Sequence, residues 1–211
     1  MNPLRSVSGT IIGGVVLAIV LVLVTQGSHQ VMIAEASIIL WLHVLAGITW
    51  IGLLYYFNFI QVPALGEAAS DDGGPGGAGI TKYIAPRALL WFRWSALATW
   101  VTGAAYLLRL GAGPGNALGA LDDAFTLGMT GDSVNAYAMT IGIGAWLGTI
   151  MLFNVWVLIW PSQKKILGMV EASADEIAKA RNIALLASRS NTLMSIPMVM
   201  SMVGAHHGFF M

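Results

Sequence analysis

Long apolar runs constrain what this chain can fold into more than any short motif does. A run of about 20 apolar residues crosses the hydrocarbon core of a bilayer as an α-helix. The chain has five such runs, at about residues 9–26, 36–61, 88–110, 136–160 and 188–209. Hydrophobic residues make up 57% of the chain and charged residues 9%, far below the charge of soluble domains. The sequence therefore predicts an all-α integral membrane protein with five transmembrane helices.

The second to fifth helices are expected to form a four-helix bundle, with the first helix packed outside it. The segments 62–87, 111–135 and 161–187 are rich in Gly, Pro or charged residues, which is typical of connections outside the bilayer. Pro161 is expected to end the fourth helix. Ser173 and Glu176 have the spacing of a capping box, which predicts that a helix starts there and continues into the fifth span.

Basic residues predict how the chain is oriented in the membrane. Lys and Arg gather in or beside 62–87 and 161–187, and Arg5 precedes the first span. Basic connections stay on the cytoplasmic side, so the amino terminus and both connections are expected there. The loop 111–135 and the carboxyl terminus are then expected on the opposite, outer side of the membrane. The start of the second span and the end of the fifth lie in the same outer half.

Histidines occupy both of these helix ends. His43 lies in the second span, and His206 and His207 lie near the end of the fifth. An ionisable side chain inside a hydrophobic span is costly and usually faces protein. His206 shares a helical stripe with polar and small side chains, so it is the expected inward residue and His207 the alternative. We predict that His43 and His206 bind the iron of one haem.

Small and aromatic side chains predict the walls of this pocket. The residues expected to line it are Gly47, Trp50, Gly144, Gly148 and Met202. Gly47 and Trp50 follow His43 on one helical stripe, whereas Gly144 and Gly148 have small-xxx-small spacing. That glycine pair has two open interpretations, which are tight helix packing and the close approach of a flat ring.

Three further polar residues lie inside the predicted spans, namely Arg93, Asn58 and Asn154. Each needs a partner in the membrane, so each is a candidate polar contact for a substrate. Snorkelling to the interface is the other interpretation of Arg93. All three are expected toward the cytoplasmic half, away from His43.

Composition excludes several kinds of cofactor. The chain has no cysteine, so it cannot hold a disulfide, a cysteine-ligated iron–sulfur cluster or a covalently attached haem. Non-covalent haem b remains as the expected cofactor. Two alternatives stay open: a copper or zinc site, and histidines that make ordinary hydrogen bonds and no metal contact. The net charge is zero, and nothing suggests nucleic acid as a partner.

Several ordered segments resemble a known family. They are HVLAGITWIGLLYYFNFIQVPAL at 43–65, WFRW at 91–94 with Thr102-Gly103, and RSNTLMSIPMVMSMVGAHH at 189–207. They resemble the membrane domain of the bacterial membrane-bound urate oxidase (urate hydroxylase) family, the urate oxidase N-terminal domain, over about residues 36–207. The HVLAGITWIG part is also similar to other small haem- or copper-associated membrane proteins, among them the bacterial membrane protoporphyrinogen oxidase.

The resemblance implies a redox membrane domain, in which characterised members couple urate oxidation to a c-type cytochrome. Those members carry a cytochrome c domain after the membrane part, which this sequence lacks, so a separate cytochrome is expected as the partner. The favoured prediction is a membrane-integral b-type haem protein that passes electrons to or from a periplasmic cytochrome or a respiratory complex. Two alternatives stay open: a membrane-bound oxidase of urate, a related small heterocycle or a porphyrin, and a cofactor-free structural subunit of a membrane complex.

Overall fold

The computed structural model describes residues 2–26, 35–111, 116–131 and 133–207, and it is helical along most of them. The helices are α1 (Val7–Gln26), α2 (Glu35–Tyr55), α3 (Val62–Ser70), α4 (Ala85–Arg109), α5 (Ala120–Phe125), α6 (Ala136–Phe153), α7 (Trp160–Ile166) and α8 (Ala174–His207). The chain divides into two units at residue 35, and each is described by itself.

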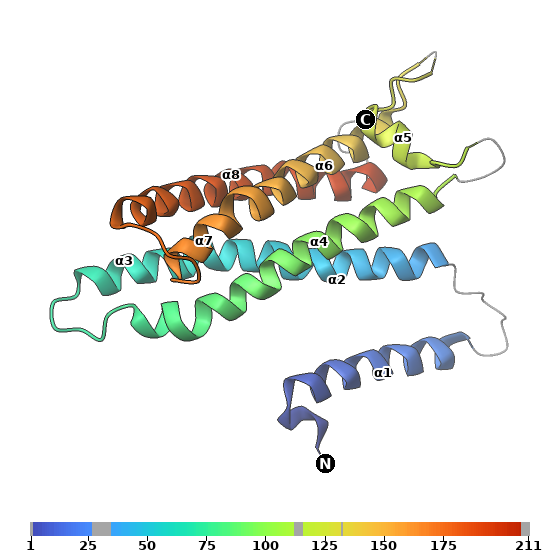
Figure 1. Cartoon of the computed structure of the whole chain (residues 1–211). Coiled ribbons are helices and arrows are strands. Elements are labelled where there is room, and N and C mark those ends of the chain that lie inside the picture. Colours follow the sequence, from blue (N-terminus) through green and yellow to red (C-terminus); the bar gives the residue numbers. More distant parts are fainter. Residues whose placement is uncertain (1, 27–34, 112–115, 132, 208–211) are drawn as a thin grey trace. The chain divides into compact units, whose positions relative to one another are not determined.

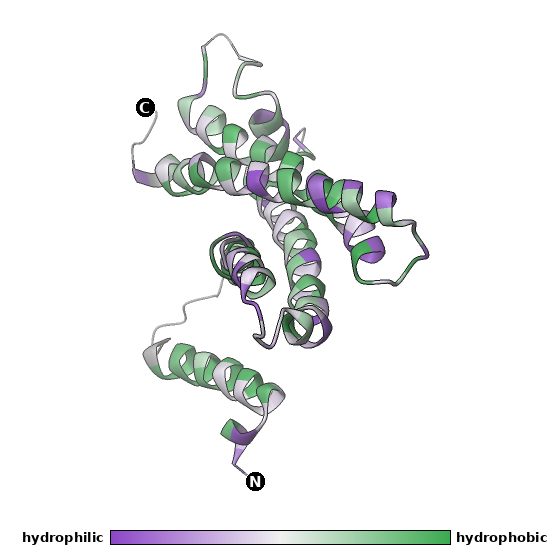
Figure 2. Cartoon of the chain, turned by 90° about the vertical axis from the view of Figure 1, so that its left-hand side faces the viewer, coloured by the Kyte–Doolittle hydropathy of each residue, from purple (hydrophilic) through white to green (hydrophobic). Residues whose placement is uncertain are grey.

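The first unit consists of α1 and a short 3-10 turn at Pro3–Arg5 that precedes it. The helix VSGTIIGGVVLAIVLVLVTQ has no charged residue, and Figure 2 shows apolar residues along its length. Its isoleucine, leucine and valine side chains are exposed on every face. A helix that is apolar all round suits a lipid environment rather than a surface position on a soluble protein.

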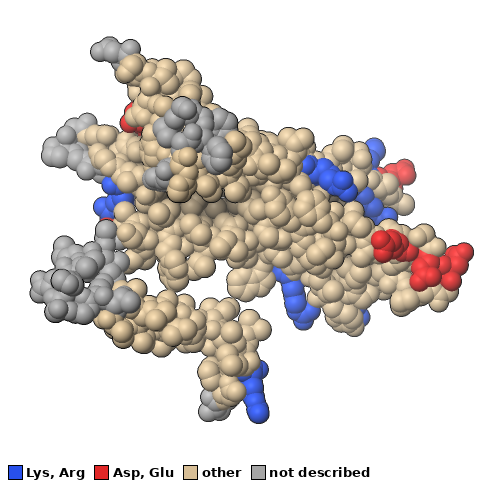
Figure 3. Space-filling view, turned by 180° about the vertical axis from the view of Figure 1, so that it is seen from behind, with Lys and Arg blue, Asp and Glu red and all other residues tan. Residues whose placement is uncertain are grey.

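The second unit is built from α2, α4, α6 and α8, which run in alternating directions (Figure 1). Its core is formed by side chains from all four helices, including Met198 of α8, and Trp50, Leu54, Phe92 and Met151 are each at most 1% exposed. On the face shown in Figure 3, charged side chains lie toward the two ends of this unit, with a broad uncharged band between them. Such a band is what a bilayer core requires of a protein surface.

Within the described residues, three helical stretches are long and apolar enough to cross a membrane: Val7–Val24, Glu35–Ser70 and Ala136–Ile166. An all-helical, multi-pass membrane protein is therefore supported. The other two predicted spans correspond to α4 and the second part of α8, whose sequences are more polar. Several of their polar side chains are buried against neighbouring helices, among them Thr99, Asn191, Ser195 and Ser201. Polar residues at helix contacts are a normal feature of membrane bundles.

Three prolines each lie two positions after the last residue of a π-helical turn. The turns are Tyr56–Gln61, Ile80–Ile84 and Asn154–Ile159, and the prolines are Pro63, Pro86 and Pro161. In each turn an N–H bonds the carbonyl five residues earlier, as Trp160 does with Val155. Proline lacks an N–H and clashes with the carbonyl four residues back, so a wider turn before it lets the helix continue.

These turns correct two expectations from the sequence. Pro161 does not end its helix, because the chain continues as α7 to Ile166. The connection 62–87 is also more helical than expected, since α3 extends the second predicted span to Ser70 and a π-helical turn leads into α4. The helical start at Ser173 is confirmed: the Ser173 N–H donates to Glu176 Oε2 at 2.9 Å, and the Glu176 N–H donates to Ser173 Oγ at 3.2 Å.

Candidate functional site

A cavity of about 600 Å³ lies inside the second unit, between α2, α4, α6 and α8. Its walls are mainly apolar, and Phe125 at the end of α5 also lines it. Polar atoms come from a few side chains, chiefly His43, Trp50, Tyr55 and Thr99. A volume of a few hundred cubic ångströms with apolar walls and few polar groups is typical of a pocket for a small molecule or cofactor.

His43 is the ionisable side chain of this cavity, and its ring is held by α4. Its Nδ1 lies 2.8 Å from the carbonyl oxygen of Thr99. A carbonyl can only accept, so Nδ1 carries the proton and Nε2 keeps a lone pair. The ring packs on Gly103, where an added Cβ would lie 2.9 Å from Cε1 and 3.0 Å from Nδ1. A glycine at this position of α4 therefore makes room for the imidazole.

The two glycines of α6 have different surroundings. A Cβ on Gly144 would lie 2.7 Å from Met202 Cε and 3.1 Å from Ser201 Oγ, so this glycine allows close packing on α8. A Cβ on Gly148 would meet nothing within 4 Å, and Gly148 lines the cavity. Tight helix packing is thus seen at Gly144, which also lines the cavity, whereas the close approach of a flat ring to this pair stays a prediction.

The two tryptophans that line the cavity, Trp50 and Trp100, differ in their hydrogen bonding. The Trp50 side chain is 1% exposed, and its Nε1 has no hydrogen-bond partner among the described residues. In contrast, Trp100 Nε1 donates to Thr149 Oγ1 at 2.8 Å. A buried donor without an acceptor is costly, so this indole N–H is an unusual feature of the cavity wall, although the atom itself is not accessible from the cavity.

The structure brings most of the predicted cofactor residues together. His43, Gly47, Trp50, Gly144, Gly148 and Met202 all line this one cavity. The side chain of His206 lies outside the described residues, although its backbone belongs to α8, one turn after Met202. His207 is exposed. That these residues bind a cofactor remains a prediction.

The three predicted polar contacts lie elsewhere, and each has a partner within the protein. Asn58 Nδ2 donates to the Leu54 carbonyl at 2.9 Å and to Ser188 Oγ at 2.8 Å. Asn154 Nδ2 donates to Asn191 Oδ1 at 2.8 Å. The guanidinium of Arg93 lies 3.9 Å from the ring centroid of Trp160.

The contribution of α4 to the cavity was missed at the level of sequence. Thr99 and Gly103 were not predicted as site residues, yet they position the His43 ring. Their four-residue spacing puts a small side chain and a free carbonyl lone pair on one face of a helix, which is the signal that was available. Among the described residues, no group of three or more His, Cys, Asp or Glu is placed to hold a metal ion.

Comparison with known proteins supports a family relationship over part of the chain. Residues 125–211 match the family model described as urate oxidase N-terminal. No curated protein and no solved structure matches the chain at a significant level. The match includes α6 and α8, which supply Gly144, Gly148 and Met202 to the cavity, and it ends short of α2 and His43. Over residues 125–211, the chain is therefore similar to the urate oxidase N-terminal family.

Proposed function

We propose that this chain is a membrane-integral redox protein that holds one b-type haem in the cavity and exchanges electrons with a separate cytochrome or respiratory complex. The proposal is supported mainly by the hydrogen bond of the His43 ring to α4, which sets the tautomer of the ring. Its Nδ1–H donates to the Thr99 carbonyl, which leaves Nε2 as the nitrogen able to bind a metal. Histidines that bind metals almost always donate their other N–H in this way, because the bond fixes the ring and raises its basicity.

The residues present fit such a group. His43 would hold the iron of such a group, and His206, on the Met202 stripe of α8, is the proposed second ligand. Gly148 leaves open space in the wall, and the Trp50 indole lines the same cavity. The bound haem would supply one-electron chemistry, whereas the chain binds it, orients it and keeps water out through its apolar walls.

The membrane arrangement is part of the same proposal. We place α4 and the second part of α8 across the bilayer with the three apolar stretches, which gives five spans. The amino terminus and the basic connections then face the cytoplasm. In this orientation the cavity lies toward the periplasmic side of an inner membrane, within reach of a periplasmic electron carrier.

The test is a visible spectrum of the detergent-purified protein, taken as dithionite-reduced minus oxidised, with a pyridine haemochrome assay. Sharp α and Soret bands are expected for the wild type, and their loss is expected in His43→Ala and His206→Ala. The matched control is His29→Ala, a histidine in the connection between the first two predicted spans, which should keep the bands. Thermal unfolding of each variant separates loss of haem from loss of fold.

The outcomes distinguish the alternatives. If the bands are lost in His207→Ala but kept in His206→Ala, His207 is the second ligand. A featureless spectrum from protein expressed with haem available would overturn the proposal. Unchanged folding of all histidine variants would then point to a cofactor-free subunit of a larger complex.

A second candidate function is oxidation of urate or a related small heterocycle, with electrons leaving through a separate cytochrome. It is favoured by the description of the matched family and by a cavity of suitable size that Trp50 lines. The test is consumption of urate by membranes that contain the chain and an added c-type cytochrome. Consumption that disappears in Trp50→Phe would support this function, and no consumption above membranes without the chain would exclude it.

A further inference from the structure

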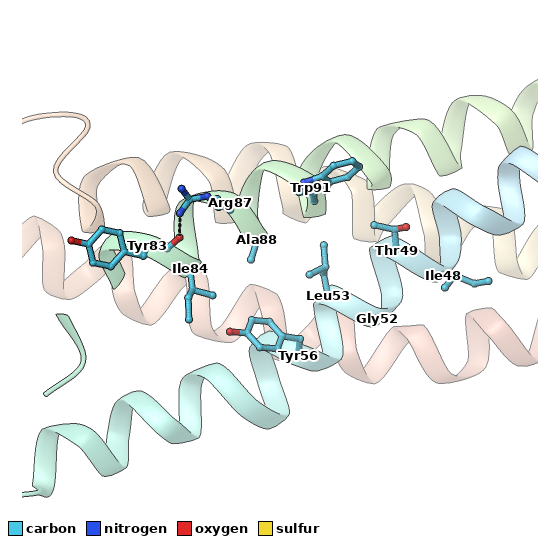
Figure 4. Close-up of a pocket in the computed structure, with 10 residues that line it drawn as sticks. All are labelled: Ile48, Thr49, Gly52, Leu53, Tyr56, Tyr83, Ile84, Arg87, Ala88 and Trp91. Carbon is cyan, nitrogen blue, oxygen red and sulfur yellow. Dashed lines mark hydrogen bonds between the residues drawn. The ribbon is translucent and has the colours of Figure 1, made fainter. Parts of the chain in front are cut away.

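A second hollow lies on the outside of the bundle, between α2 and the start of α4. It is an open groove of about 660 Å³ that runs along the lipid-facing sides of both helices (Figure 4). Ile48, Leu53 and Trp91 give it an apolar floor. Arg87 and Tyr83 lie together at one end, and Ile48 lies at the other (Figure 4).

Two cations lie near the charged end of the groove: Arg87, which lines it, and Lys82, which is not one of its lining residues. Arg87 Nη1 donates to the carbonyl oxygen of Tyr83, which holds the guanidinium at the end of the groove. The next basic residue, Lys82, has its Nζ 5.4 Å from the ring centroid of Tyr83. No acidic side chain in the described part of the chain forms an ion pair with Lys82 or Arg87. The two positive charges are therefore available to an anion.

We propose that this groove binds one anionic phospholipid. Its acyl chain would lie along Leu53 and Trp91, and its phosphate would meet Arg87 and Lys82. Charge complementarity favours this ligand, because an apolar groove with two cations near one end matches an apolar chain that ends in a phosphate. The proposal rests on the proposed insertion of α4 in the membrane, and it requires no haem.

The position of the groove gives the lipid a structural role. Ile48 and Gly52 line both the groove and the internal cavity. A Cβ on Gly52 would meet nothing within 4 Å, so the wall at this point carries little side-chain material. An acyl chain in the groove covers this thin wall from the membrane side.

The test is lipid retention by the full-length protein in detergent, measured by native mass spectrometry. The probes are phosphatidylglycerol and phosphatidylcholine with identical acyl chains. The wild type should prefer phosphatidylglycerol, and the preference should fall by about fivefold for each cation removed in the double variant Lys82→Gln, Arg87→Gln. The matched control is Lys179→Gln, Arg181→Gln, which removes two exposed charges from the start of α8 and should keep the preference.

A second measurement locates the acyl chain. Phosphatidylglycerol with brominated chains should quench part of the tryptophan fluorescence, and this part should be missing in Trp91→Phe. Equal retention of both lipids by the wild type would overturn the proposal. So would equal losses in the two double variants, or the same quenching in Trp91→Phe as in the wild type. None of these results depends on haem, so they are independent of the spectra that test the proposed function.

Discussion

The imidazole of His43 and the backbone carbonyl of Thr99 lie 2.8 Å apart, Nδ1 to oxygen, across the contact between α2 and α4. The two residues are 56 positions apart in the sequence. The bond fixes one tautomer of the ring, and Gly103 supplies the space that the ring needs. A mutation on α4 can therefore disturb the proposed metal ligand without touching His43.

Gly103→Ala is the direct test of this relationship. The new Cβ would lie 2.9 Å from His43 Cε1, so the ring must move away from Thr99. We expect a loss of about 1–3 kcal/mol in the free energy of unfolding, typical of overpacking, together with weaker haem retention. Unfolding in detergent and the visible spectrum measure the two effects.

The matched control for this change is Gly148→Ala on α6. A Cβ there meets nothing within 4 Å, and alanine favours a helix, so stability should stay the same or rise. Equal destabilisation by the two substitutions would contradict a specific contact between Gly103 and His43.

Trp50→Phe tests whether the unpartnered indole serves a bound molecule. Phenylalanine keeps much of the apolar volume and removes a buried donor that has no partner among the described residues. Because an unsatisfied donor contributes no hydrogen bond, the cofactor-free protein should lose less stability than the about 3–5 kcal/mol of a Trp→Ala change. The fraction of protein that retains haem should fall, and unchanged retention would exclude a contact with the indole.

Asn191 joins α6 to α8 through two hydrogen bonds. It is fully buried, accepts from Asn154 Nδ2 at 2.8 Å and donates to the Met151 carbonyl at 3.0 Å. Asn191→Leu leaves both groups without their partner and should cost about 1–3 kcal/mol in the free energy of unfolding. The effects of Asn191→Leu and Asn154→Leu should not add in the double variant, because they share one bond. Additive effects would contradict the pairing.

Glu176 gives a prediction for the dependence of stability on pH. The Ser173 backbone N–H, and after it Lys165, holds the pKa of this carboxyl below its ordinary value. A lowered pKa in the folded state means that the ionised form stabilises the fold above the ordinary pKa, and that this stabilisation is lost as pH falls through the lowered value. The difference in melting temperature between wild type and Glu176→Ala should be largest near neutral pH and vanish in acid. A difference in melting temperature that is constant with pH would contradict the lowered pKa of Glu176.

Local patterns in the sequence predicted the features that depend on neighbouring residues. The Ser173 and Glu176 capping box forms because its partners are three positions apart. On α8, Ser195 lies on the helical stripe of polar and small side chains that contains position 206, and it is fully buried, whereas Leu193 on another face is 70% exposed.

Features that depend on distant residues or on the hydrogen-bond pattern could not be predicted. The partner of His43 is a backbone carbonyl, which every residue of α4 possesses, so no side-chain pattern singles out Thr99. Pro161 was expected to end a helix because a proline breaks the α-helical pattern. The sequence gives no sign that the preceding turn, Asn154–Ile159, would widen to a π-helix and let the helix continue.

The thin wall at Gly52 has a kinetic consequence. Ile48 and Gly52 separate the internal cavity from the groove on the lipid side. An apolar compound dissolved in the bilayer reaches the outer side of this wall by lateral diffusion, without passing through water. The rate at which such a compound encounters this wall depends on its concentration in the membrane. That concentration is the product of its aqueous concentration and its partition coefficient.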